Sequence, residues 1–275
     1  MKAIVNKQVC HLYTRPTREC SLTDEVLYGM VVELLEEPVP GWYRVRTHYR
    51  YEGYAAAEDL LTENAESWEL AEKCMVLNKN QCDVLSEPRV QGYPMQVLPR
   101  GGLVIPEGEA AEGWQKVRLA DGRRGFVPAS IVVPQPLEPV FREEQALRRA
   151  LVEKALLYQG THYRWGGKSP QGIDCSGLCS MAYMLCGILI YRDADIKEGF
   201  PIREIPMERI APGDLLFFPG HVAMYMGEGR FCHSTGKQGS NGFAVNSLDP
   251  HAPDYREDLH KTITKVGSWF MKTDP

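Results

Sequence analysis

The sequence lacks three features that would each point to a class of function. It has no basic excess, since 31 Lys and Arg residues face 36 Asp and Glu and the net charge is −5, so neither nucleic acid nor a membrane surface is an expected partner. No apolar run approaches the roughly 20 residues of a membrane-spanning helix. The eight cysteines include no CxxC pair, and 275 residues is too long for a small disulfide-stapled domain. What is present is an ordinary globular composition, long enough for two or three domains.

The N-terminal segment carries no leader pattern. Lys2 supplies a positive charge, but Asn6, Lys7 and Gln8 interrupt the stretch before an apolar core of a signal peptide can form. We therefore expect a cytoplasmic protein, or a secreted one if a leader has been removed from it.

The first half of the chain contains an internal repeat. A shift of 72 residues places Pro16 on Pro88, Gly29 on Gly101, Gly41-Trp42 on Gly113-Trp114 and Gly53-Tyr54 on Gly125-Phe126. Each copy alternates apolar and polar residues between Gly and Pro turns, which is typical of short strands in a small β-barrel. The pattern of a turn, Gly-Trp, a strand and a second Gly-aromatic strand resembles bacterial SH3-like domains. We predict barrels at 1–62 and 64–134, with the role of the second left open.

A different domain follows a proline-rich linker. Three prolines between Val133 and Pro139 indicate a semi-rigid linker, placed at 135–143. Residues 142–157 have the apolar stripe of an amphipathic helix. Strand patterns then appear at 214–218, 221–226, 230–233, 244–248 and 262–271. Helices followed by an antiparallel sheet predict an α+β domain over 144–275.

The loop before the first apolar helix of this domain delivers a cysteine to the helix start. It reads YRWGGKSPQGIDCSG over 163–177, and an apolar run continues to Gly187, which can end the helix. The helix dipole and unpaired backbone N–H groups favour the thiolate of Cys175 over the thiol. We interpret Cys175 as a nucleophile and the other cysteines as buried apolar residues.

Two histidines complete a catalytic set. His221 lies 46 residues after Cys175 and His233 lies 12 residues further, on strand patterns joined by a glycine turn. His221 can act as the base and ion-pair partner of the thiolate, and His233 can fix the tautomer of its ring. Cys179 shares a helix face with Cys175, but one such pair is too weak a pattern for zinc, so we expect neither a metal nor a cofactor.

Several segments together resemble a known enzyme family. The 163–177 loop, PGDLLFF at 212–218, GHVAMYMG at 220–227 and FCHS at 231–234 look like the NlpC-type murein-peptide hydrolases, with a papain-like fold. The upstream barrels make the chain similar to the γ-D-glutamyl-L-diamino acid endopeptidases of that family, which cleave murein tri- or tetrapeptides during cell-wall recycling. The resemblance implies a Cys175, His221, His233 triad, with the Tyr163 hydroxyl helping to stabilise the oxyanion.

The resemblance also implies substrate contacts. Asp174 and Ser176 flank the nucleophile as substrate-binding residues do in the family, and Arg192-Asp193 matches a family Arg-Asp pair, although Ala194 replaces the serine that often follows. In the first barrel, Tyr51 together with Asp24 or Glu25 would meet the ammonium of a free N-terminal L-Ala. Such a contact would reject N-blocked chains.

Other functions fit parts of the pattern. The chain could be an exported hydrolase of intact peptidoglycan whose barrels bind the wall, a silent adaptor that binds peptides, or an acyltransferase or amidase on a related fold. The sequence does not determine the choice between L-lysine and meso-diaminopimelate, the oligomeric state or any protein partner.

Overall fold

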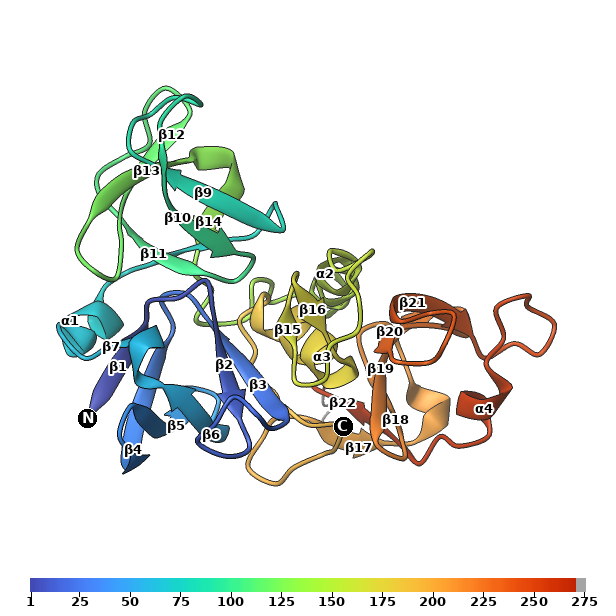
Figure 1. Ribbon diagram of the computed structural model, residues 1–275. Helices are drawn as coiled ribbons and strands as arrows, with labels where there is room; N and C mark the ends of the chain where they lie inside the picture. Colours follow the sequence, from blue (N-terminus) through green and yellow to red (C-terminus); the bar gives the residue numbers. More distant parts are fainter. Residues whose placement is uncertain (271–275) are drawn as a thin grey trace. The chain divides into compact units, whose positions relative to one another are not determined.

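A computed structural model describes residues 1–270 of the protein (Figure 1). The described chain divides into two compact units. The first comprises residues 1–135 together with 165–170, and the second comprises 136–164 together with the residues from 171 on. None of the helices in the described part is both long and apolar enough to cross a bilayer.

Two seven-stranded antiparallel sheets, drawn in blue and green in Figure 1, form most of the first unit. The strands of the first sheet are β1 (Lys2–Val5), β2 (Val9–Tyr13), β3 (Leu22–Leu27), β4 (Val31–Val39), β5 (Trp42–Thr47), β6 (Glu52–Ala56) and β7 (Leu60–Leu61). Those of the second are β8 (Cys74–Val76), β9 (Gln81–Leu85), β10 (Pro94–Pro99), β11 (Leu103–Pro106), β12 (Trp114–Arg118), β13 (Arg124–Pro128) and β14 (Val132–Pro134). Short helices η1 (Ala57–Asp59) and η2 (Ala129–Ile131) precede the last strand of each, and α1 (Ala65–Leu70) joins the sheets.

The predicted repeat is confirmed by the strand order. The first sheet runs β3-β2-β6-β5-β4-β1-β7 and the second runs β10-β9-β13-β12-β11-β8-β14, which is the same order seven strands later. The two Gly-Trp pairs form equivalent turns, one in each barrel. Gly41 and Gly113 both have φ of +83°, and the tryptophan that follows each is the first residue of β5 or β12. A left-handed turn of this kind favours glycine at both positions.

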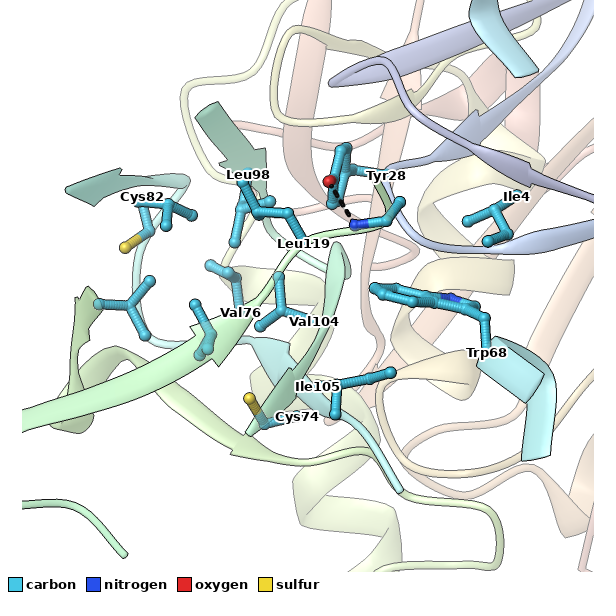
Figure 2. Packing of buried hydrophobic residues seen from close by; sticks show 14 of the residues in the cluster. Ile4, Tyr28, Trp68, Cys74, Val76, Cys82, Leu98, Val104, Ile105 and Leu119 are labelled. Carbon is cyan, nitrogen blue, oxygen red and sulfur yellow. Dashed lines mark hydrogen bonds between the residues drawn. The ribbon is translucent and has the colours of Figure 1, made fainter. Parts of the chain in front are cut away.

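The two barrels share one apolar core. Trp68 of α1 is buried, and its indole Nε1 donates to the Gly29 carbonyl at 2.7 Å. The Tyr28 hydroxyl accepts a hydrogen bond from the Ala120 N–H at 3.0 Å. Figure 2 shows these side chains, with Ile4, beside residues of the second barrel such as Val104. The second barrel therefore packs against the first through a continuous core and is more than a mobile spacer.

The second unit begins with two helices. Helix α2 (Glu144–Leu156) starts at Glu143, whose carboxylate accepts the N–H groups of Gln145 and Ala146, and helix α3 (Cys175–Met184) packs against α2 and the sheet. Gly187, with φ of +81°, follows α3, and a Cβ there would meet the Glu138 carbonyl oxygen at 2.0 Å. Short strands β15 (Lys168–Ser169) and β16 (Gly172–Ile173) lie in the loop before α3.

A six-stranded antiparallel sheet, in orange and red in Figure 1, completes this unit in the order β17-β22-β18-β19-β20-β21. Its strands are β17 (Arg203–Ile205), β18 (Leu215–Phe218), β19 (His221–Gly227), β20 (Arg230–Thr235), β21 (Gly242–Ser247) and β22 (Lys265–Ser268), with η3 (Met207–Arg209) and α4 (Glu257–His260) between them. The predicted α+β order is confirmed. The last predicted strand segment reaches Met271, which lies outside the described residues.

Candidate functional site

Helix α3 begins at the cysteine that the sequence singled out. Asp174 is its N-cap residue and accepts the Gly177 N–H at 2.6 Å. This cap leaves Cys175 as the first helical residue, where backbone N–H groups have no partner within the helix. Cys175 is only 6% exposed.

Burial outweighs the helix terminus in setting the charge of this thiol. It raises the pKa of Cys175 to about 11, and the Asp174 charge acts in the same direction, while hydrogen bonds from the Val222 and Ser176 N–H groups act against it. The sequence favoured a thiolate, whereas the buried side chain favours the neutral thiol in the free protein. The Val222 contact also places the sulfur at the start of β19, where Val222 directly follows His221.

The two histidines meet because of how their strands pair. The register of β19 and β20 sets Met224 opposite Cys232, so His221 and His233 lie on one face as diagonal neighbours, within reach of ring side chains. His221 Nε2 and His233 Nδ1 are 2.8 Å apart, and the rings meet edge to face. The structure thus brings together the two predicted histidines.

Asn246 extends the hydrogen-bonded pair of histidines onto a third strand, and the sequence analysis did not identify it. Its Oδ1 lies 2.9 Å from His233 Nε2, and its Nδ2 donates to the Asp254 carbonyl oxygen at 2.9 Å. On β21 it is again a diagonal neighbour, since His233 pairs with Ala244. The sequence indicated a strand here but held no signal for which residue of that strand would reach His233.

The direction of these hydrogen bonds follows from the last acceptor. A backbone carbonyl only accepts, so the amide atom facing Asp254 is the NH₂ group and Oδ1 faces His233. His233 Nε2 must then carry a proton, which leaves Nδ1 to accept from His221 Nε2–H. Nδ1 of His221 consequently holds the free lone pair, in the tautomer that a general base requires.

Both imidazoles are held neutral. Burial lowers the pKa of His221 to about 4, and the Arg256 charge contributes in the same direction. His233 is fully buried, and burial followed by the neighbouring His221 lowers its pKa to about 3. A buried neutral histidine costs stability in acid, because the unfolded chain binds a proton that the folded chain refuses.

We expect the loss of stability in acid that the buried, neutral His233 causes to be smaller in His233→Gln than in the wild type. Between pH 6.5 and about 3 the unfolded wild type binds more protons than the folded protein, so its free energy of unfolding falls as the pH falls. The variant should lack up to about 1.4 kcal/mol per pH unit of that slope. Urea unfolding at several pH values measures it. Above pH 6.5 the two curves should run parallel, and identical slopes below it would contradict the assignment.

The residues around the cap form a buried network. The Arg192 guanidinium, 1% exposed, donates to both Asp174 carboxylate oxygens at 3.1 and 3.2 Å and to Ser176 Oγ at 2.7 Å. Asp174 is thus a helix cap and the partner of Arg192 in a bidentate pair. Asp174 directly precedes an apolar helix in the sequence, which is the pattern of an N-cap residue. Its capping role could therefore have been predicted from the sequence.

Other predicted residues lie near this network. Asp193 accepts the Tyr191 hydroxyl at 3.1 Å. Tyr163 is half-buried, and burial, followed by the charges of Cys175 and Asp174, raises the pKa of its hydroxyl to about 12. It therefore stays protonated and able to donate a hydrogen bond at neutral pH.

The predicted substrate residues of the first barrel belong to the first unit. Tyr51 is half-buried and shares a hydrogen bond of 2.9 Å with Thr23. Asp24 and Glu25 are fully buried. The Asp24 carboxylate accepts the Tyr49 hydroxyl, and Glu25 accepts the Lys168 N–H at 3.0 Å. In the free protein both carboxylates already have partners.

Comparisons with known proteins agree with this architecture. A model described as the NlpC/P60 family matches residues 160–256, and one described as the bacterial dipeptidyl-peptidase Sh3 domain matches residues 12–60. A protein named Dipeptidyl-peptidase 6 from Lysinibacillus sphaericus is 46% identical over 274 residues, which cover 98% of this chain and 100% of the relative. The chain belongs to the NlpC/P60 family. This NlpC/P60 chain is also 32% identical to the Gamma-D-glutamyl-L-lysine dipeptidyl-peptidase of Bacillus cereus over 116 residues, which cover 39% of this chain and 33% of the relative.

A solved structure matches the fold over nearly the whole chain. The crystal structure of an NlpC/P60 family protein from Bacillus cereus ATCC 10987 superposes with a TM-score of 0.78, covering 97% of this chain and 98% of that chain at 18% identity. This likeness supports the fold alone, which is two all-β barrels followed by an α+β domain.

Proposed function

We propose that this NlpC/P60 protein is a cysteine endopeptidase that cleaves the γ-D-Glu to L-diamino acid bond of murein peptides and releases L-Ala-D-Glu. The observation that carries the proposal is the 46% identity to Dipeptidyl-peptidase 6 over the length of both chains. The site supplies two groups that the reaction needs. One is the Cys175 thiol at a helix start, which accepts the Val222 N–H, and the other is the His221 imidazole, which directly precedes Val222 on β19 and has a free lone pair at Nδ1.

In the proposed reaction the Cys175 proton passes to Nδ1 of His221 as the sulfur attacks the γ-carbonyl carbon of D-Glu. The carbonyl oxygen becomes an oxyanion, which the Cys175 N–H and the Tyr163 hydroxyl stabilise. The C–N bond then breaks, and His221 returns its proton to the amine of the diamino acid. Water attacks the resulting thioester with His221 again as base, which frees L-Ala-D-Glu and restores the thiol.

The raised pKa of the thiol and the lowered pKa of the imidazole indicate a neutral resting pair. The proton therefore moves during the attack, when the negative charge leaves the sulfur for the substrate oxygen. Two features would assist this step. Substrate binding would exclude water from the site, and the hydrogen bonds from His221 through His233 to Asn246 would orient the imidazole.

Substrate recognition stays a prediction for the remaining residues. Ser176 directly follows the nucleophile in α3 and lines a pocket together with Asp193. Asp174 and Arg192 would act through the hydrogen-bond network around the start of α3, which includes Ser176. Tyr51 with Asp24 or Glu25 is predicted to meet the substrate ammonium. That ammonium would have to share or replace the partners that the two carboxylates have in the free protein. The substrate is a murein tri- or tetrapeptide, and we place the enzyme in the cytoplasm.

The test is incubation with L-Ala-γ-D-Glu-L-Lys and with its N-acetylated form, and the products are identified by mass spectrometry. The proposal requires L-Ala-D-Glu and lysine from the free peptide. The isomer linked through the α-carboxyl of D-Glu is the matched control and should stay intact. The proposal would be overturned if the enzyme cleaved neither the γ-linked lysine peptide nor its diaminopimelate counterpart.

Asn246→Ala tests whether Asn246 fixes the tautomers of His233 and His221. Without the amide oxygen, His233 is free to adopt the other tautomer, and His221 then loses the acceptor that fixes its ring. We expect kcat to fall by about 10- to 100-fold with little change in KM, less than the roughly 10⁴-fold loss seen when a triad imidazole is forced into the wrong tautomer. Steady-state kinetics on the γ-linked tripeptide measure it.

Asn246→Asp is the matched variant. Its carboxylate still accepts from His233 Nε2, so it should keep more activity than Asn246→Ala. An Ala variant as active as wild type would exclude a positioning role for Asn246.

A further inference from the structure

A fully buried lysine lies seven residues before the nucleophile and takes no part in the proposed chemistry. Lys168 is 0% exposed, on β15 in the loop that leads to Cys175. A buried ammonium is costly unless it is paired, so its partners indicate what it holds in place.

Those partners lie on the first barrel, and they are as buried as the lysine. Lys168 Nζ lies 3.5 Å from both carboxylate oxygens of Asp24 and 3.6 Å from the centroid of the Tyr49 ring. The Tyr49 hydroxyl donates to the same carboxylate, which joins the three side chains into one cluster. An ammonium over an aromatic face gains further stabilisation when it is desolvated.

The backbone of the segment is held as well. The Lys168 N–H donates to Glu25 Oε2 at 3.0 Å, and the other oxygen of Glu25 lies 3.3 Å from His11 Nε2. Two residues earlier, Gly166 has φ of +73°, and a Cβ there would lie 2.9 Å from the Cβ of Leu22. The segment thus fits closely against β3.

These contacts explain why residues 165–170 belong to the first unit while the residues on both sides belong to the second. The chain leaves the catalytic domain at Trp165, is fixed in the barrel at Lys168 and re-enters at Gln171, four residues before Cys175. In some proteins a buried polar group fixes the position of the segment that carries it, as a single buried asparagine fixes the register of a coiled coil.

We propose that Lys168 is a positioning residue, which holds the loop before the nucleophile on the first barrel through Asp24 and Glu25. The barrel is then part of the support of Cys175 in addition to any role in substrate binding. The catalytic readout of this inference rests on the proposed peptidase function, but a second readout does not.

The experiment compares Lys168→Met with the double variant Asp24→Asn/Lys168→Met in the full chain. The single variant leaves Asp24 buried without its cation and should lower both Tm and kcat, the latter by at least about tenfold. The double variant removes that charge and should regain Tm. Its kcat should stay low, because neither new side chain holds the loop in place. Arg100→Met, which removes a buried cation bonded to Asn80 in the second barrel, should lower Tm and leave kcat unchanged.

The second readout is the rate at which iodoacetamide alkylates Cys175. Peptide mapping assigns the alkylated residue, because Cys20 is partly exposed and can react too. We expect this rate to change at least threefold in the double variant, whether or not any peptide is cleaved. If kcat and the alkylation rate both return to wild-type values together with Tm, the role of Lys168 is only structural and the inference is overturned.

The same double variant separates the two roles of Asp24. If Asp24 serves only to hold Lys168, the preference for free over N-acetylated peptide survives in it. Loss of that preference with normal alkylation would assign Asp24 to the substrate ammonium and overturn the anchoring role. A wild type that cleaves no murein peptide would refute the proposed function alone, and the alkylation rates would still decide the inference.

Discussion

Cys175→Ala is expected to abolish cleavage of the γ-linked tripeptide, with a loss in kcat of at least about 10⁴-fold, as for removal of the nucleophile from other covalent peptidases. The thioester cannot form without the sulfur, and neither histidine is placed to replace it. The change removes one atom at a nearly buried position, so the fold should be retained. Initial rates on the γ-linked peptide and thermal unfolding measure the two properties.

Cys179→Ala is the matched control for this experiment. Cys179 lies one turn further along α3, is 1% exposed, and burial raises its pKa well above the usual range. Its loss removes the same atom from the same helix and should lower stability slightly with activity retained. If Cys175→Ala remained as active as Cys179→Ala, the covalent mechanism would be excluded.

N-acetylation of the substrate is expected to lower kcat/KM by at least about 10²-fold, which corresponds to about 2.7 kcal/mol. The acetyl group removes the positive charge that the predicted acidic partner would meet, and a carboxylate left unpaired in a partly desolvated site is costly. Competition between the two peptides in one tube, followed by mass spectrometry, gives the ratio directly.

A C-terminal amide on the same peptide is the control at the other end, and it should change kcat/KM far less. Tyr51→Phe should reduce the discrimination if the Tyr51 hydroxyl contributes to it. Equal cleavage of free and acetylated peptides would refute the free-amine requirement while leaving the peptidase activity in place.

Part of the site could be predicted because its signals are local in the chain. The position of Cys175 follows from a glycine-rich loop running into an apolar helix, and the two histidines follow from adjacent strands joined by a short turn, whose pairing is nearly fixed by the turn. The barrel boundaries at 62, 64 and 134 rest on the internal repeat and its resemblance to SH3-like domains, the end of the linker at 143 rests on proline content, and all of them stay predictions.

Asn246 and the Arg192 to Asp174 pair could not be predicted in the same way. Asn246 reaches His233 only through the register of β20 and β21, which are joined across the loop at 236–241. Arg192 reaches the helix cap from 18 residues away. A polar residue in a strand or loop has many possible partners, and the partner is chosen only when the chain is packed.

The repeated barrels and the positions of the nucleophile and the two histidines could be inferred from the sequence, because periodicity, turn residues and a helix start are patterns that span only a few residues. The partners of the buried charges became known only from the packed chain. Asp24 and Glu25 were predicted to meet a substrate ammonium, which stays a prediction. The structure places the Lys168 ammonium beside Asp24 and the Lys168 N–H on Glu25. The physical reason is that a buried charge must find its opposite within a few ångströms, and which opposite lies there depends on segments more than 140 residues apart.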